Sequence, residues 1–174
     1  MAIPPTGGRY ATLPVGRHQA TFEQVYEAFV ENAPFRDDRE VIFEALTLYA
    51  KIVANLCPGL ALWVNGGFIT HKSWAAPKDA DVVVVVPQAH YPNVCSNPSV
   101  WTYITLQGVI VSDPSTGGGR IGRIQPMAGL IDGFIISDDP TLSDVWAYRW
   151  SLVNDEDGNL LPDTTRKGFL EVKL

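Results

Sequence analysis

Cysteine, histidine and long hydrophobic runs are scarce in this 174-residue sequence. Its two cysteines, Cys57 and Cys95, cannot build a disulfide framework, and their spacing matches no zinc motif, so we expect reduced, buried thiols. The longest apolar run, Val82 to Pro87, has the length of a strand and is far short of the ~18 residues of a membrane span. The first ten residues lack the charged and apolar regions of a secretory signal. We therefore expect a cytoplasmic protein that does not enter a membrane.

Positive charge is also scarce. The chain has 13 Lys and Arg residues against 19 Asp and Glu residues, which gives a net charge of −6. Binding to long nucleic acids is driven largely by neutralisation of their phosphates, so the charge argues against strong nonspecific nucleic-acid binding. A small nucleotide, or a nucleic-acid end that meets a local basic patch, remains compatible with this composition.

The composition that is present is that of one folded domain. Hydrophobic residues make up 46% of the chain and charged residues 18%, which excludes a disordered chain. The length fits a single domain over residues 1–174. Proline and glycine predict an irregular arm over residues 1–20, apolar spacing predicts a helical lead-in over 21–57, and residues 60–174 are expected to form a sheet core.

Strand-like and helix-like segments alternate in the sheet core. Apolar segments predict strands over 60–65, 81–86, 130–136 and 169–172, and shorter ones over 109–111 and 123–125 around a Gly-rich loop. Helices are expected over 98–106 and 141–152, the second with an inward face made of Leu142, Val145, Trp146 and Trp150. Helices followed by strands that are broken by helices indicate an α/β or α+β fold, with a mixed β-sheet flanked by helices.

The most informative stretch covers residues 63–86. A strand ends in the pair Gly66-Gly67, eleven residues follow, and Asp79-Ala80-Asp81 then opens an all-apolar strand. Residues i and i+2 of a strand share a face, so Asp79 and Asp81 place two carboxylates side by side at a strand end. Mg²⁺ prefers such hard oxygen ligands together with substrate phosphates. The bland alternatives are a plain glycine turn and two turn-forming aspartates.

This pattern resembles the signature of the polymerase-beta-like nucleotidyltransferase superfamily: Gly followed by Gly or Ser, a gap, and an Asp-x-Asp/Glu strand. The superfamily adds a third carboxylate on a later apolar strand, which the segment GLIDGFII supplies as Asp132. Outside this motif, the LPVGRH segment and the Lys167-Gly168-Phe169-Leu170 segment are similar to those of small uncharacterised nucleotidyltransferase-like proteins of bacteria and phages.

The resemblance implies a role for each motif residue. Gly66 and Gly67 would let the backbone approach the phosphates of a nucleoside triphosphate. Asp79, Asp81 and Asp132 would hold Mg²⁺ or Mn²⁺, with Asp132 beside the acceptor hydroxyl. The implied reaction transfers a nucleoside monophosphate to that hydroxyl and releases pyrophosphate. The acceptor is a small molecule, an RNA end or a protein side chain.

The sequence departs from the superfamily pattern at three positions. Gly67 replaces the Ser of many members, Asn65 stands where an apolar residue is usual, and Gly133 follows the third carboxylate. An alternative is therefore a catalytically weak or inactive module of the same fold, which senses nucleotide or binds a protein partner or a second copy. A toxin–antitoxin or phage–host component is an example. A structural protein with accidental motif spacing is the third hypothesis.

Two further cationic positions are candidates for phosphate binding. Lys72, next to His71, lies in the loop after the glycine pair, where a solvated loop is the plain alternative. Arg120 lies in the Gly-rich segment 117–123, which is not a Walker motif and fits a flexible hairpin loop better than a phosphate clamp.

Overall fold

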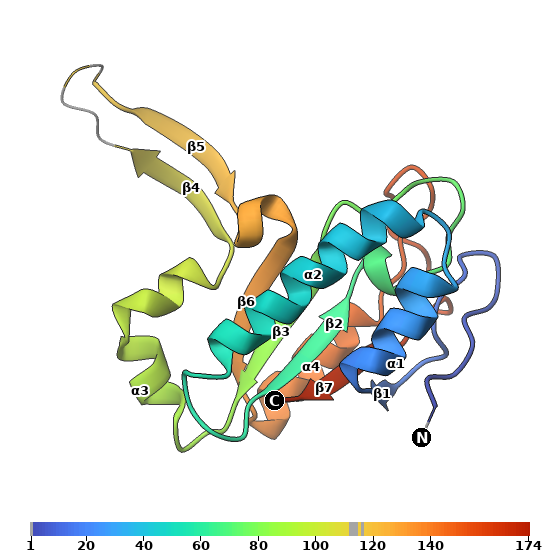
Figure 1. Cartoon of the computed structure of the whole chain (residues 1–174), viewed down its shortest axis with the longest axis horizontal. Helices are drawn as coiled ribbons and strands as arrows, with labels where there is room; N and C mark the ends of the chain where they lie inside the picture. The colour runs from blue at the N-terminus through green and yellow to red at the C-terminus, as the bar shows by residue number, and fades with distance from the viewer. Residues whose placement is uncertain (1, 112–114, 116) are drawn as a thin grey trace.

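The computed structural model describes residues 2–111, 115 and 117–174 (Figure 1). Its centre is a mixed five-stranded sheet in the order β1-β7-β2-β3-β6. The strands are β1 (Arg17–Gln19), β2 (Ala61–Asn65), β3 (Ala80–Val86), β6 (Ile131–Ser137) and β7 (Phe169–Lys173). β1 is parallel to β7 and β3 is parallel to β6, whereas β2 is antiparallel to both of its neighbours. The expected α+β class, a mixed sheet flanked by helices, is confirmed.

Helices cover both faces of the sheet. α1 (Phe22–Tyr26), the π-helix η1 (Glu27–Glu31) and α2 (Arg36–Val53) lie on one face, and α4 (Pro140–Trp150) lies on the other (Figure 1). The α2 face includes Gly133, where an added methyl group would lie 3.3 Å from Tyr49 Oη of α2. The α4 face includes Phe134, whose ring centroid lies 5.1 Å from that of Trp146. We use the names α2 face and α4 face below.

The register places the expected motif residues in one row. Asn65 of β2 pairs with Asp81 of β3, and Asp81 pairs with Asp132 of β6. Side chains alternate along a strand, and Gly133 and Phe134 fix the faces. All three residues therefore belong to the α4 face, at one end of the sheet.

Several boundaries differ from the expectations. The irregular arm contributes β1, whose three residues are too few to give a periodic signal. An unpredicted helix, α3 (Tyr91–Ser96), precedes the short 3₁₀ segment η3 (Pro98–Thr102). Leu142 and Val145 are 42% and 59% exposed, so the inward face of α4 is narrower than expected and is formed by Trp146 and Trp150. Cys57 is half-buried and Cys95 is exposed, which corrects the expectation that both thiols are buried.

A two-stranded hairpin projects from the body of the molecule. It consists of β4 (Leu106–Val111) and β5 (Gly119–Ile124), and Figure 1 shows it pointing away from the five-stranded sheet. The expected loop over 112–122 is thus partly strand, and its residues 112–114 and 116 lie outside the described residues. The 3₁₀ segments η2 (Gly67–Ile69) and η4 (Met127–Gly129) precede the starts of β3 and β6. No helix in the described part of the chain is long and apolar enough to cross a membrane.

Candidate functional site

A polar row crosses the end of three strands on the α4 face. Asn65, Asp81 and Asp132 are paired in register, in strands that are otherwise almost wholly apolar. Asn65 is buried, and its Nδ2 donates to the Trp150 carbonyl at 2.9 Å. Its Oδ1 has no partner within the described residues. An unpaired buried oxygen costs free energy, so this end of the sheet is not arranged for stability alone.

Gly66 brings the end of β2 against Asp81. Its φ of +83° lies in the region that favours glycine, and a methyl group there would overlap Asp81 Oδ2. The next residue, Gly67, begins η2, and a methyl group on it would lie 3.2 Å from Lys72 Nζ. Glycine at both positions therefore lets the backbone lie close to the Asp81 carboxylate at Gly66 and close to the Lys72 ammonium group at Gly67.

The surroundings of Asp81 disfavour ionisation of its carboxyl group. Burial, followed by the negative charges of Asp79 and Asp132, raises its pKa to about 6, and Lys167 opposes that rise. Because each neighbouring carboxylate disfavours ionisation of Asp81, the three groups lie within electrostatic reach of one another. The structure thus brings together the three aspartates that the sequence singled out.

Asp132 and Asp79 are held by side chains from the hairpin and its flanks. Asp132 Oδ1 accepts from Thr105 Oγ1 at 2.6 Å, and Asp132 Oδ2 forms a salt bridge with Arg123. Asp79 Oδ2 accepts from Gln125 Nε2 at 2.9 Å. The base of the hairpin therefore supplies one cation and one amide to the carboxylates.

A cavity of about 380 Å³ opens beside the glycine pair. Its wall includes Gly66, Gly67, Lys72, Asp81 and Lys167, together with residues of the N-terminal arm and of the 152–158 loop. Burial lowers the pKa of both lysines. Arg39 and Lys78 lower the pKa of Lys72 further, while Lys72 lowers and Asp81 raises the pKa of Lys167. Neither lysine forms a salt bridge within the described residues. An anion in this cavity would relieve the repulsion between them.

Two acidic residues on the opposite wall are already engaged. Glu156 pairs with Arg9 at 3.2 Å. Asp155 accepts from the backbone N–H groups of Asp157 and Asn159 at 3.0 and 2.8 Å, and hydrogen bonds within this turn lower its pKa. Neither lysine thus forms a salt bridge in the described chain, and the carboxylates that act on them electrostatically are Asp79 for Lys72 and Asp81 for Lys167.

Arg39 fixes the loop that carries Lys72. It is fully buried on α2 and donates to the carbonyls of Phe68 and Thr70 at 2.5 and 2.6 Å. It also donates to the carbonyls of Phe29 and Pro34. Burial lowers its pKa to about 10. Because its donors are spent on backbone carbonyls, Arg39 positions the loop and does not face the cavity.

Neither Arg120 nor His71, the neighbour of Lys72, lines the cavity. Arg120 sits on β5 opposite Ile110, three residues from Arg123 and therefore on the other face of the hairpin. An added methyl group on Gly108 would lie 3.2 Å from its guanidinium. His71 packs its ring on Phe29 and bonds the Ala28 carbonyl at 2.7 Å, so it closes the loop against η1.

Lys167, Arg123 and Gln125 were not singled out as site residues by the sequence. Side-chain period gave no signal for Lys167, because it precedes β7 and is not part of a strand. Its place beside Asp81 depends on β7 lying next to β2, which only the topology reveals. The contacts of Arg123 and Gln125 depend on how the hairpin meets the sheet.

The carboxylates are of the kind that hold a divalent cation. Asp79 and Asp81 offer hard oxygen ligands, and the raised pKa of Asp81 shows a place where positive charge is stabilising. Asp132 is engaged by Thr105 and Arg123, and no group of three or more His, Cys, Asp or Glu side chains among the described residues is arranged as a finished metal site. The donor set therefore fits a cation held mainly by two carboxylates and by ligand oxygens.

Comparison with known proteins gives one match. No curated protein and no solved structure is similar enough to match this chain. One family model, described as a family of unknown function (DUF6932), matches residues 5–173, which is nearly the whole chain. The chain therefore belongs to the family of unknown function DUF6932.

Proposed function

We propose that this chain is a divalent-metal-dependent nucleotidyltransferase with a polymerase-beta-like arrangement, acting in the cytoplasm. The observation that carries the proposal is the cavity beside Gly66, whose wall holds two lysines without a salt bridge in the described chain and the half-buried carboxyl group of Asp81. A metal-bound triphosphate presents the same pattern of charge, with phosphates for the lysines and a cation for the carboxylates.

Each residue has a defined task in this proposal. Lys72 and Lys167 bind the β- and γ-phosphates, and Gly67 lets backbone N–H groups approach them. Asp79 and Asp81 would hold Mg²⁺ or Mn²⁺, and Asp132 would join them if its salt bridge with Arg123 were broken. When bound, the cation neutralises the charge that develops on the phosphoryl oxygens.

The proposed reaction is an in-line displacement. The hydroxyl oxygen of the acceptor forms a bond to the α-phosphorus, and the bond from that phosphorus to the bridging oxygen breaks. Pyrophosphate leaves with the electron pair, and the hydroxyl proton passes to the carboxylate of Asp132. Chemistry of this kind consists mainly of positioning and charge neutralisation, which a rigid strand end provides. The acceptor is an alcohol of a small molecule, an RNA end or a protein.

A thermal-shift titration tests the nucleotide site. Each of the four nucleoside triphosphates is added with and without Mg²⁺ or Mn²⁺ to the wild type and to Asp79→Asn/Asp81→Asn. A ligand at 100 times its Kd stabilises the folded state by about 2.7 kcal/mol. We expect a divalent-dependent shift with at least one nucleotide and no such shift in the double variant. A shift of equal size in the double variant would contradict the assignment.

A second candidate is a nucleotide-binding module without catalysis, which engages a protein partner or a second copy. The contacts of Arg123 with Asp132 and of Gln125 with Asp79 favour it, because they occupy carboxylate oxygens with hairpin side chains. The two candidates differ in turnover. Release of pyrophosphate from the bound nucleotide across a panel of acceptor alcohols supports the enzyme. Divalent-dependent binding with no release supports the module.

A further inference from the structure

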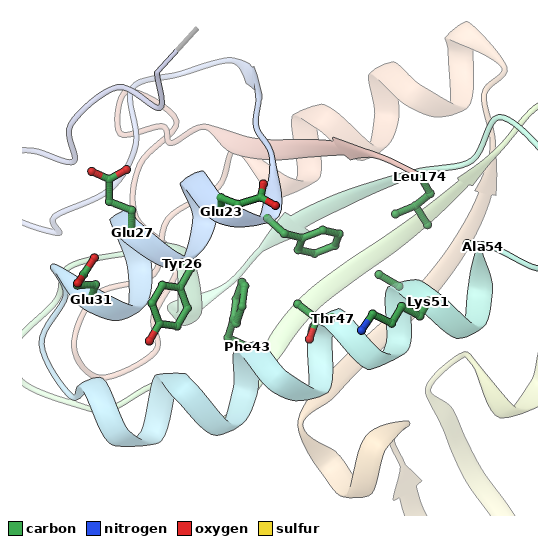
Figure 2. A pocket seen from close by; sticks show the side chains of 11 residues that line it. Glu23, Tyr26, Glu27, Glu31, Phe43, Thr47, Lys51, Ala54 and Leu174 are labelled. Carbon is green, nitrogen blue, oxygen red and sulfur yellow. The ribbon is translucent and has the colours of Figure 1, made fainter.

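A groove on the α2 face lies apart from the nucleotide cavity. It runs between α1–η1 and α2 and encloses about 770 Å³ (Figure 2). Aromatic rings and small apolar side chains line it: Phe22, Tyr26, Phe43, Ala50, Ala54 and Leu174. Phe43 contacts the two other rings, with centroid distances of 6.3 Å to Phe22 and 5.1 Å to Tyr26. The sheet separates this groove from the carboxylate row on the α4 face, so the groove is not part of the proposed active site.

The rim of the groove is acidic along one side. Glu23, Glu27 and Glu31 follow one another at intervals of four residues on α1 and η1, and all three side chains are exposed (Figure 2). None of them forms a salt bridge within the described chain. Lys51 is the only cation that lines the groove among the described residues, and it comes from the other wall. Glu23 has a hydrogen bond with Thr21, and Glu31 acts electrostatically on Arg36, but no salt bridge of the described residues neutralises the rim. Three exposed carboxylates beside an apolar floor disfavour a phosphate or a nucleic acid and favour a cation with an apolar side.

The spacing of the glutamates specifies the shape of the occupant. Residues four apart on a helix are neighbours on its surface, so a second helix lying alongside presents matching charges when its Lys or Arg residues are also four apart. An apolar stripe on that helix would fill the aromatic floor, as in helix-in-groove recognition. The described helices of this chain do not meet the requirement. α2 has Arg36, the buried Arg39 and Lys51, whereas α4 has Arg149 alone, which argues against a second copy as the occupant.

We propose that the groove between α1–η1 and α2 binds a basic amphipathic helix of a different protein, whose Lys or Arg residues pair with Glu23, Glu27 and Glu31 while its apolar stripe covers Phe22, Tyr26 and Phe43. The proposal does not depend on the nucleotidyltransferase assignment, because no residue of the groove belongs to the carboxylate row or to the lysine cavity.

The test uses a fluorescein-labelled model helix of about 18 residues, with leucines on one face and lysines at intervals of four on its flank. Its control peptide has glutamate in place of each lysine. Fluorescence anisotropy is measured with the full chain at low ionic strength. We expect saturable binding of the lysine peptide and none of the glutamate peptide. Glu27→Lys should weaken the binding about fivefold, the size expected for one exposed ion pair. Asp144→Lys, an exposed α4 position with the same change in net charge, should leave it unchanged.

A second measurement locates the peptide independently of affinity. In an NMR titration, amide shifts should concentrate on Ala50, Ala54 and Leu174, which line the groove. Phe43→Ala should weaken binding further, and a thermal melt establishes that this variant is folded. Equal binding of the two peptides, equal effects of Glu27→Lys and Asp144→Lys, or shifts centred on another face would overturn the proposal. Tighter competition by spermine than by an unlabelled lysine helix would also overturn it. A dimer of the free chain that the peptide disrupts would overturn it as well.

Discussion

The two faces of the sheet differ in the residues that they carry at one end of β3 and β6. On β3, the residues that face α2 are Val82, Val84 and Val86, and all are buried. On the α4 face, the same strand begins with Asp81, next to Asp132 of β6. Val83 and Val85 are buried on the α4 face too, so both faces stabilise the fold, but the end of the α4 face concentrates polar groups that weaken it. A sheet does not need carboxylates in this row to fold, so their cost indicates function.

The buried Arg39 and the half-buried Lys72 and Lys167 differ in the same way. Arg39, on the α2 side, has four backbone carbonyls as partners, whereas Lys72 and Lys167 have none of comparable quality and lie at a cavity. The first is a structural clamp, and we propose that the other two bind the phosphates of a nucleotide. The predictions below separate these roles, beginning with the largest expected effect.

Replacement of the clamp should damage folding most. Arg39→Met leaves the carbonyls of Phe29, Pro34, Phe68 and Thr70 without their donor, so we expect a loss of about 4 kcal/mol in the free energy of unfolding. Urea denaturation measures it. Arg36→Met, an exposed change on the same helix, serves as the control and should leave the midpoint nearly unchanged. Equal midpoints for the two variants would show that Arg39 is not a clamp.

The half-buried carboxyl group of Asp81 should make the free energy of unfolding depend on pH. The folded pKa of Asp81 is about 6 against an ordinary 3.8, so the folded chain holds this proton more tightly than the unfolded chain. The free energy of unfolding should therefore fall as pH rises from about 4 to about 6, by at most about 3 kcal/mol for this group. Asp81→Asn should flatten that part of the profile and be the more stable protein at pH 7. An exposed change, Asp157→Asn, should retain the wild-type slope.

Glycine 66 should be required for both the fold and the site. Gly66→Ala combines a positive φ with overlap on Asp81 Oδ2, so we expect a loss of about 2 kcal/mol in stability and the loss of the nucleotide-induced thermal shift. Gly8→Ala separates the two causes, because Gly8 has a φ of +71° and nothing within 4 Å of an added methyl group. It should cost less and keep the shift. The idea fails if both variants lose the shift equally.

Lys167 should contribute to nucleotide affinity rather than to the stability of the fold. Lys167→Met should weaken triphosphate binding about tenfold through loss of a charge-assisted contact, and weaken monophosphate binding less. Calorimetric titration with the two nucleotides gives the ratio. Lys173→Met, an exposed change at the far end of β7, is the matched control. A uniform loss for both nucleotides would place Lys167 away from the terminal phosphates.

The smallest effect should come from the hairpin. The Arg123–Asp132 salt bridge is partly exposed, so Arg123→Ala should change stability by less than about 1 kcal/mol. It should raise Mn²⁺ affinity about threefold, because a cation no longer competes with the guanidinium for Asp132. Arg120→Ala, on the other face of the hairpin, should leave the affinity unchanged. A lower Mn²⁺ affinity in Arg123→Ala would mean that the hairpin supports the metal site instead of closing it.

Local pattern was enough to predict most of the helices and strands and the place of Asp81 at a strand end, whereas Asp132 was singled out through the resemblance to a superfamily. The continuous valines of β3 predicted a strand covered on both faces, and the apolar residues around Asp132 predicted a buried strand, because both signals depend only on neighbours in sequence. The placement of Lys167 beside Asp81 could not be predicted, because it requires β7 to pair with β2 across more than 100 residues of chain. β1 has only three residues and gains its structure from β7.

The buried face of α4 was predicted to be wider than it is. Leu142 and Val145 were expected to face inward, yet α4 lies on the sheet through Trp146 and Trp150, whose large rings keep the rest of the helix at a distance. Periodicity predicts which side of a helix is apolar, but the size of the contacting residues decides how wide the buried stripe is. The acidic groove on the α2 face was not predicted, since it forms between two helices and not within either.

Paramagnetic broadening by Mn²⁺ tests the central assignment most directly. The ion is titrated, together with a nucleoside triphosphate that gave a thermal shift, into the ¹⁵N-labelled chain, and the loss of amide signals is mapped. The account predicts that broadening centres on Gly66, Gly67 and Asp81 and disappears in Asp79→Asn/Asp81→Asn. Broadening centred on the 155–163 loop or on the glutamate rim of α1, or a pattern that the double variant does not alter, would contradict it.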